Sequence, residues 1–584
     1  MKKKIAKSLS FLLVAGMLLS LTACGGSAVS SGAPAASEKT DAPVTITILG
    51  ALDAKTMQNG IQSDPVAKYI EKKLGIQMNV IIADTAGDIG SKINAMIATN
   101  DLPDICYLPD FTKQLMAAEK AGELLPLDSY LADYGKNLNS IPINKFSNAY
   151  FKKNLSVDGK LYGLGTLKGA MDNGLNPGIS NYIRWDLYKQ LGYPAINTWD
   201  DLLPILKKMQ DLEPKTKDGS KVYGIGAFFG ESGSDALITY MPGYVNGVLS
   251  LGSCWSFDAK TNSMSDKDNF NDLNSSWWQS IRFFNKAYQM GILDPDSITQ
   301  KNTQYMEKVQ AGKYLWVPQS GNAVSANDFF SKSGEKDKGF VAIAPLTKDA
   351  FIQTASAPTG QNDIVISKNC KHPEKAVELL DFFNSYEGCR IVTNGVEGTN
   401  WNMVNGKPTA TEEYKNATID TDFEKKTGAM LYQFFNGLTD VTIDPTYNQT
   451  INLLAQPEVE ATHMTTMQKD AATHYGMPLD QVYSSAKVHA FSWDIPSSLN
   501  DAQANMPDSL KVSEDSIVNY VNNFCRSKLI YAKTDAEFTK AQQEFISTVN
   551  SKGLDKVFNY YKSQSASINA MYDKLLQETG YKVN

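Results

Sequence analysis

Aromatic and polar side chains occur together in several short stretches that look like loops or strand ends. YMPGYVNG (240–247) is rich in glycine and tyrosine, and LWVPQSGN (315–322) carries Trp316 and Gln319. An aromatic ring can stack on the C–H face of a ligand, and burial of that apolar area contributes about 25 cal/mol per Å². Amides and carboxylates can bond hydroxyl groups, and a missing partner costs about 1–3 kcal/mol. If the protein binds a sugar, which needs both residue types together, these stretches are where the ligand contacts are expected.

Strand ends and loops supply the candidate ligand contacts, and core packing explains any single tryptophan equally well. The candidates are Asp53, Tyr107, Asp110, Tyr240, Tyr244, Trp255, Trp316, Gln319, Asn322, Trp401 and Trp493. Asp104 has two interpretations, because a carboxylate in LPD can contact a ligand or cap its own turn.

The sequence offers little for metal or nucleophilic chemistry. Its four histidines form no HExxH motif and no close pair, and its cysteines form no CxxC spacing. The loop DLEPKTKDGSKVYG (211–224) lacks the alternating oxygen ligands and the following acid of a calcium loop. We expect no catalytic residue, no metal and no cofactor. A formal net charge of -7 without a basic cluster in the body argues against nucleic-acid binding.

The front of the chain predicts export and anchoring. Three lysines at positions 2–4 precede the uncharged stretch SLSFLLVAGMLLSLTA (8–23), which is too short for a comfortable membrane span. The following LTACG resembles the lipobox of bacterial lipoproteins, which implies a lipid on Cys24 and an extracellular, membrane-anchored protein. Residues 25–43 are small and polar and predict a flexible tether. The other five cysteines can be free thiols or form one or two disulfides, and buried free thiols are the simpler expectation.

The body predicts an open α/β architecture that positions these loops. PVTITILG (43–50) alternates as a strand, DPVAKYIEKKLGI (64–76) is an amphipathic helix, and QMNVIIA (77–83) is a second strand. Thr198 is a good N-cap for the helix that follows it. A chain of 584 residues exceeds one usual domain, so two lobes are expected. The expected segments are a signal peptide (1–23), the lipidated cysteine and tether (24–43), the first part of an N-terminal lobe (44–155), the first part of a C-terminal lobe (156–335), a return to the N-terminal lobe (336–430) and a helical region completing both lobes (431–584).

Five stretches, in the right order, resemble the bacterial extracellular solute-binding proteins of ABC importers, family 1 type. They are NAMIATNDLPDICY (94–107), VDGKLYGLG (157–165), NYIRWDLYKQLGYPAINTWDDLLPILKKM (181–209), AGKYLWVPQ (311–319) and CKHPEKAVELLDFFNSYEGCRIVTNGVEGTNW (370–401). Asn100 stands where the family usually has glycine, and Trp185-Asp186 reverses the usual order.

The resemblance implies a type II periplasmic-binding-protein fold, with a ligand cleft between two lobes joined by hinge crossings. It further implies a monomeric, non-catalytic receptor that captures an oligosaccharide and delivers it to ABC permease subunits. Two alternatives stay open: an exported carbohydrate-active enzyme that uses two carboxylates, and the same receptor fold with a peptide ligand or a sensor role.

Overall fold

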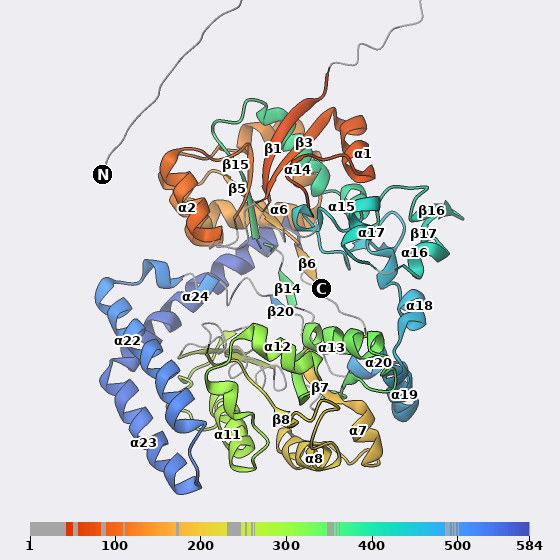
Figure 1. Ribbon diagram of the computed structural model, residues 1–584. Helices are drawn as coiled ribbons and strands as arrows, with labels where there is room; N and C mark the ends of the chain where they lie inside the picture. The colour runs from red at the N-terminus through yellow and green to blue at the C-terminus, as the bar shows by residue number, and fades with distance from the viewer. Residues whose placement is uncertain are drawn as a thin grey trace, which may run out of the picture. The chain divides into compact units, whose positions relative to one another are not determined.

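The computed structural model describes residues 42–50, 57–82, 89–108, 111–170, 175–230, 247–250, 254–258, 261, 263–346, 355–357, 359–360, 362–417, 419–484, 491–492, 495, 498–499 and 502–582. Contacts divide the chain into an N-terminal segment, Met1–Ala42, and a body, Pro43–Asn584. The body contains two main β-sheets, each accompanied by helices (Figure 1). This confirms the predicted α/β fold with two lobes.

The first sheet has six strands, and its core is parallel. In spatial order the strands are β2 (Gly60–Ile61), β3 (Ile76–Ile82), β1 (Val44–Gly50), β4 (Ile105–Leu108), β15 (Asn362–Ile366) and β5 (Gly163–Thr166). β1 pairs in parallel with both β3 and β4, whereas β15 runs antiparallel to β4 and β5. The helices that accompany this sheet include α1 (Pro65–Leu74), α2 (Ile89–Thr99), α3 (Phe111–Lys120), α6 (Pro142–Tyr150), α14 (Pro373–Phe383) and α15 (Tyr386–Asn394).

Local sequence explains the first β-α-β unit. Asp64 caps α1 by accepting from the backbone N–H groups of Val66 and Ala67, at 3.0 and 3.1 Å. Gly75 ends the helix with φ of 66°, a left-handed conformation that costs glycine little. The chain then enters β3 at once, so α1 connects two strands that pair in parallel, β1 and β3.

The second sheet is smaller and mixed. Its strands are, in spatial order, β13 (Phe340–Ala342), β7 (Ile179–Arg184), β12 (Tyr314–Gln319) and β8 (Tyr223–Ile225). β12 and β8 are parallel, and β7 is antiparallel to β12 and β13. The neighbouring helices include α7 (Trp185–Gln190), α8 (Trp199–Leu212), α11 (Ser276–Gln289), α12 (Asn302–Gln310) and α13 (Ser320–Lys332). The predicted N-cap Thr198 is confirmed, and the side chain of Asp201 accepts from its backbone N–H at 2.9 Å.

A third, three-stranded sheet includes two segments that connect the two main sheets. Its strands, in the order β20 (Phe491–Ser492), β14 (Ala355–Ala357) and β6 (Gly169–Ala170), come from three distant parts of the chain. β6 lies between β5 and β7, and β14 lies between β13 and β15, so both belong to crossings between the main sheets. The crossings therefore pair with each other.

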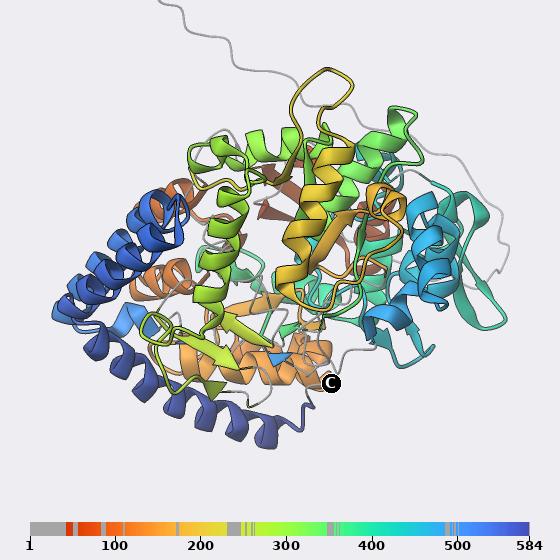
Figure 2. The same ribbon diagram turned by 90° about the horizontal axis from the view of Figure 1, so that it is seen from below.

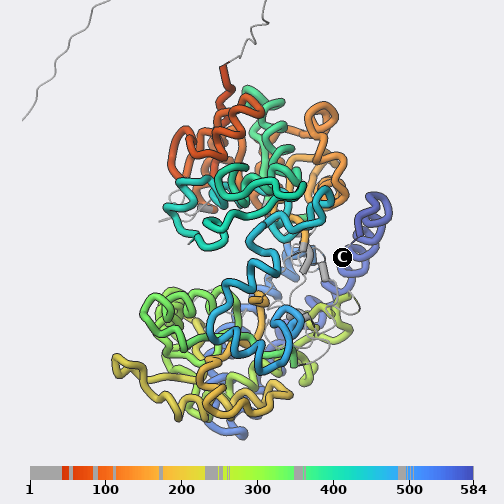
Figure 3. Tube along the Cα trace, turned by 90° about the vertical axis from the view of Figure 1, so that its right-hand side faces the viewer, coloured from red at the N-terminus to blue at the C-terminus, as the bar shows by residue number. Residues whose placement is uncertain are grey.

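A further passage follows the hairpin of β18 (Ile443–Asp444) and β19 (Gln449–Thr450). It runs through α18 (Pro457–Glu460) to α19 (Thr466–Tyr475) and α20 (Leu479–Ser484). In Figure 3 this light-blue segment passes from the elements around the first sheet to those around the second.

The C-terminal helices are α22 (Asp508–Phe524), α23 (Asp535–Ser551) and α24 (Leu554–Thr579), and they run along one edge of the body in Figure 2. α24 contacts α6 beside the first sheet and also β11 (Ser263–Met264) of a separate three-stranded sheet. In the described part of the chain, no helix has the length and apolar character needed to span a membrane.

Sheet membership sets the lobe boundaries. β5 belongs to the first sheet although the sequence placed residue 156 onward in the second lobe, and β13 belongs to the second sheet although residue 336 onward was expected in the first. Both crossings thus lie later than predicted, because β5 and β13 each complete a sheet before the chain leaves it. The simpler expectation of free thiols agrees with the structure for all five cysteines of the body, Cys106, Cys254, Cys370, Cys389 and Cys525.

Candidate functional site

The carboxyl edge of the second sheet carries aromatic and amide side chains together. β8 and β12 are parallel, so their carboxyl ends meet at one edge, where ligands of open α/β sheets bind. Phe228 follows β8 and is half-buried, and Gln319 ends β12 directly before α13. The side-chain amide of Gln319 is half-buried and has no hydrogen-bond partner among the described residues.

Helix α12 packs against this edge. The ring of Tyr305 lies 5.3 Å from that of Phe228, between centroids, and Asn322 donates from Nδ2 to the sulfur of Met306 at 2.9 Å. Tyr305 is fully buried, which raises the pKa of its hydroxyl, and that hydroxyl has no hydrogen-bond partner within the described structure. The edge thus combines a ring face with unused hydrogen-bonding capacity.

The carboxyl end of β1 presents a second aromatic group. Phe435 packs here, since a Cβ added to Gly50 would lie 3.7 Å from its ring. Its neighbour Phe434, in the short helix η3 (Gln433–Phe435), is 41% exposed. Asn59 lies at the end of the neighbouring strand and accepts from the backbone N–H of Ile82 at 2.7 Å.

Phe228 and Phe434 are not among the contacts predicted from the sequence. Phe228 lies three residues after the end of β8, in GIGAFFG, and is thus an aromatic residue near a strand end like the predicted candidates. Phe434 carried no such signal, because only the fold brings η3 to the end of β1.

The structure places four of the predicted aromatic contacts in the protein interior. Tyr107 in β4, Trp255, Trp316 in β12 and Trp401 in β16 (Trp401–Val404) are at most 6% exposed. The indole of Trp316 donates to Asn181 Oδ1 at 2.9 Å, and that of Trp401 donates to the backbone oxygen of Gly395 at 2.9 Å. Burial, with the nearby Asp363, raises the pKa of Tyr107 to about 12. Trp316, Gln319 and Asn322 come together on β12 and α13. Tyr107 and Trp401 lie in two other sheets, and Trp255 directly precedes β10 (Ser256–Asp258) of a further sheet.

The remaining predicted contacts lie outside the described residues, as does the predicted lipidation site Cys24. They are Asp53, Asp110, Tyr240, Tyr244 and Trp493. Asp104, in contrast, is described, and its carboxylate accepts from the backbone N–H of Thr47 in β1 at 2.9 Å. Its turn is thereby tied to the neighbouring strand, which favours the structural interpretation.

A buried lysine fixes the first crossing. Lys168 is completely buried, and its amino group donates to the backbone oxygen of Gly165 at 2.6 Å and to Asn384 Oδ1 at 2.5 Å. Its backbone N–H bonds Gly437 at 3.0 Å, and its carbonyl accepts from Thr439 at 2.9 Å. Burial lowers the pKa of the Lys168 amine to about 7, because an ammonium ion loses its hydration there. Lys168 therefore joins the crossing to the chain around residue 437.

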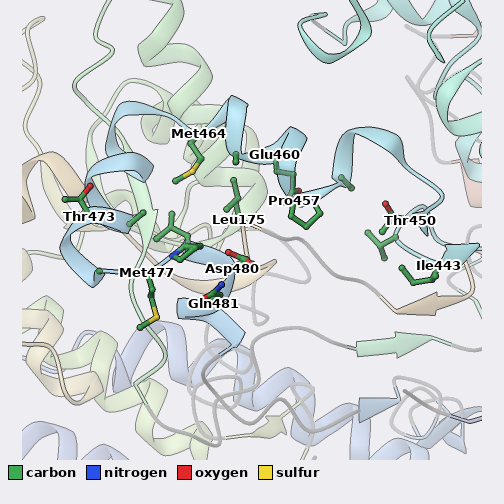
Figure 4. Close-up of a pocket in the computed structure, with 17 residues that line it drawn as sticks. Leu175, Ile443, Thr450, Pro457, Glu460, Met464, Thr473, Met477, Asp480 and Gln481 are labelled. Atoms are coloured by element: carbon green, nitrogen blue, oxygen red, sulfur yellow. The ribbon is translucent and has the colours of Figure 1, made fainter. Parts of the chain in front are cut away.

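A pocket of about 1140 Å³ lies along the later passage between the sheets. Its walls come from the β18–β19 hairpin, α18, α19 and α20, and Leu175 of the first crossing also lines it (Figure 4). In this view the labelled residues extend from Met477 and Thr473 at one end to Ile443 and Thr450 at the other. The lining is mostly apolar, unlike the polar and aromatic strand edges described above.

Two observations concern metal coordination. No group of three or more metal-ligating side chains occurs among the residues that the structure describes. In the loop first considered for calcium, the Asp218 carboxylate bonds Thr216 and Ser220, and these hydrogen bonds lower its pKa to about 2. That carboxylate stabilises its own turn.

Comparison with known proteins agrees with this description. Lipoprotein LipO of Bacillus subtilis (strain 168) is 22% identical over 444 residues, which cover 74% of this chain and 77% of LipO. The polygalacturonan/rhamnogalacturonan-binding protein YtcQ of the same organism is 22% identical over 62% of this chain and 68% of its own length. The solved structure of the S. pneumoniae ABC-transporter substrate-binding protein FusA with kestose shares the fold, with a TM-score of 0.56 at 14% identity over 90% of this chain and 99% of FusA.

The family model for bacterial extracellular solute-binding proteins matches residues 57–388, more than half of the chain. Proteins of this family bind solutes and do not transform them, so the expectation of a non-catalytic receptor is confirmed and the alternative of a carbohydrate-active enzyme is set aside. The chain belongs to the bacterial extracellular solute-binding protein family.

Proposed function

We propose that this protein is a lipid-anchored receptor that captures an oligosaccharide between its two lobes and delivers it to the permease of an ABC importer. The observation that carries the proposal is the pair of α/β sheets joined by paired crossings, each sheet with aromatic or amide side chains at its carboxyl edge. This arrangement lets two edges close on one ligand. YtcQ and a carbohydrate ABC transporter substrate-binding protein of Streptococcus pneumoniae support the choice of a carbohydrate.

In the second lobe, Phe228 and Gln319 are the described side chains that we assign to the ligand, and Phe434 is the one in the first lobe. A half-buried ring beside an unused amide suits a sugar, whose C–H face and hydroxyl groups need both. The predicted contacts outside the described residues, Asp53, Asp110, Tyr240, Tyr244 and Trp493, stay part of the proposal. For Tyr107, Trp255, Trp316 and Trp401 to contact the ligand, their surroundings would have to open. The buried Asn322 supports the edge through Met306.

The test is a glycan panel screened by thermal shift, followed by calorimetry on the best ligand. We expect saturable, micromolar binding without turnover, together with a change in tryptophan fluorescence as the lobes close. Gln319→Ala should weaken binding about two- to tenfold, the equivalent of one hydrogen bond, and Phe228→Ala about five- to thirtyfold, the equivalent of one ring contact plus its buried area. Gln577→Ala, on the exposed face of α24, is the matched control and should bind as the wild type does.

The outcomes separate the remaining alternative. If the protein binds peptides and no glycan, it is a peptide receptor. If it binds neither class and a signalling phenotype appears that does not depend on a ligand, a sensor role is favoured. Equal affinities of Gln319→Ala, Phe228→Ala and the control would remove the second-sheet edge from the ligand site.

The anchor is tested separately. Cys24→Ala should release the protein into the medium or leave the leader uncleaved, because the lipid is attached through the Cys24 sulfur. Metabolic labelling with a radioactive fatty acid measures it, and a Cys24→Ala protein that still takes up label would exclude lipidation at this cysteine. LipO, named as a lipoprotein, supports the proposal.

A further inference from the structure

The pocket along the later passage is lined by apolar side chains and by acidic ones. Its apolar part includes Met464 and Met477, and its acids are Glu460 and Asp480. Among the described residues that line it there is no lysine, arginine or histidine. An apolar ligand bearing a positive charge would match both properties, since methionines adapt to varied apolar shapes and carboxylates attract cations. A volume of about 1140 Å³ is slightly larger than the range of about 300–1,000 Å³ that is typical of pockets for small molecules.

One wall of the pocket is tied to the first sheet's helices. The β18–β19 hairpin carries Asp444, which forms a buried ion pair with Arg390 in α15. The backbone oxygen of Ile451, just after the hairpin, accepts from Asn394 Nδ2 at 2.8 Å. α15 in turn follows and contacts α14, which packs against β1.

The opposite wall is tied to the second sheet. In α19, Asp470 accepts from the indole of Trp185 at 2.9 Å and from the hydroxyl of Tyr193 at 2.7 Å. In α20, the hydroxyl of Tyr483 donates to the backbone oxygen of Ala342 in β13 at 3.0 Å. A ligand in the pocket would therefore touch elements fixed to both sheets.

We propose that this pocket binds an amphiphilic organic cation, with its apolar chain against Met464, Met477 and Leu175 and its cationic head near Asp480. The two walls belong to different lobes. A ligand in the pocket therefore stabilises one of the two arrangements of the lobes, open or closed, relative to the other. The site is thus a second ligand site that modulates closure, and this modulation rests on the proposed function above. Linkage then requires that the cation and the transported solute change each other's affinity by the same factor.

The direct test uses three probes with one chain and different heads: octyltrimethylammonium, 1-octanol and 1-octanesulfonate, each below its aggregation concentration. Binding to the purified protein is followed by calorimetry and by ¹³C-methyl resonances of methionine, with Met464→Leu and Met477→Leu assigning the two signals. We expect saturable binding that is tightest for the cation and weakest for the sulfonate, and shifts of both assigned signals. Binding of the sulfonate as tight as that of the cation, or no shift of either signal, would overturn the site.

Two variants and one control sharpen the test. Asp480→Asn should weaken binding of octyltrimethylammonium about two- to fivefold, which corresponds to the loss of one exposed ion pair. It should leave the affinity for 1-octanol unchanged. Met477→Lys should weaken binding of the cation further, because it replaces an apolar side chain of the pocket wall by a positive charge that repels the ligand. The control is Met403→Lys, because Met403 is 40% exposed on β16 outside the pocket while Met477 is 44% exposed. Equal effects of Met477→Lys and Met403→Lys would contradict the site.

Coupling is measured with the oligosaccharide identified by the glycan panel. A saturating concentration of it should change the dissociation constant of octyltrimethylammonium by about fivefold or more, and the reverse experiment should give the same factor. Binding of the cation without any coupling would refute the modulation. If the oligosaccharide binds but no octyl probe does, the pocket assignment fails and the proposed function stands.

Discussion

Replacing the buried Lys168 by methionine gives a prediction whose size follows from the structure. Lys168 has no exposed surface, and burial lowers the pKa of its amine from the ordinary value of 10.5 to about 7. The thiol of Cys389, which faces it, stays neutral because burial raises its pKa to about 12. Between pH 7 and 10.5, Lys168 is therefore the member of this pair that titrates.

The sign and size follow from proton linkage. Between pH 7 and 10.5 the unfolded chain holds more protons than the folded one, so this lysine makes the free energy of unfolding rise with pH. Its contribution is complete above pH 10.5 and is lost as the pH falls to about 7. At 1.36 kcal/mol per pH unit, the whole range is worth about 5 kcal/mol, and the step from pH 7 to pH 9 about 2 kcal/mol.

Urea unfolding of the wild type and of Lys168→Met, followed by circular dichroism at several pH values, measures this contribution. The difference in unfolding free energy, wild type minus variant, should rise by about 2 kcal/mol between pH 7 and 9, because all other titrations cancel. Lys145→Met, at an exposed lysine on α6, is the control and should give a flat difference. A flat difference for Lys168→Met would mean that the buried amine keeps its ordinary pKa, and the reasoning would be wrong.

Three further predictions concern packing, charge and thiols. Gly165→Ala should cost about 3 kcal/mol or more in a thermal or urea unfolding experiment, because its Cβ would lie 1.7 Å from the backbone oxygen of Thr359, whereas Gly321→Ala, with open space around its Cβ, should change stability by less than about 1 kcal/mol; equal effects would contradict the close approach. Arg390→Met should cost about 3–5 kcal/mol because it leaves the Asp444 carboxylate buried and unpaired, and adding Asp444→Leu should recover part of that loss in the same assay; a single-variant cost below 1 kcal/mol would argue against the buried pair. Native protein at pH 8 should react slowly with Ellman's reagent at all five body cysteines, since four are buried and burial raises the pKa of the fifth, Cys370, to about 12, and rapid reaction of any of them before denaturation would contradict this burial.

Much of the fold could be predicted because its signals are local. The alternating strand at 43–50, the capped helix that ends at Gly75, and Thr198 as an N-cap all depend on neighbouring residues, and the structure has each of them. The ends of the lobes depend instead on which sheet a short strand joins. β5 and β13 have four and three residues, too few for a periodic pattern to assign them to a sheet.

The candidate contacts were harder to predict for a related reason. Trp316 and Gln319 are three residues apart on one strand, yet Trp316 is fully buried and Gln319 is half-buried. Sequence shows that an aromatic residue is near a loop but not which way its ring points, and the orientation decides between core and ligand. Phe434 shows the converse, since its place beside β1 results from a contact between residues far apart in the sequence.

The pairing of the two crossings predicts that the proposed closure is a single hinge motion. β6 and β14 pair antiparallel, Ser356 with Ala170 and Ala357 with Gly169. Gly165 and Gly360 have no side chains, and this lets the two backbones meet where β5 ends, since a Cβ on Gly360 would lie 2.5 Å from the backbone oxygen of Thr166. Hydrogen bonds along such a ribbon resist sliding of one strand past the other but allow both to bend together. We therefore expect the lobes to rotate about one axis across this ribbon, with Lys168 holding its first-sheet end in place.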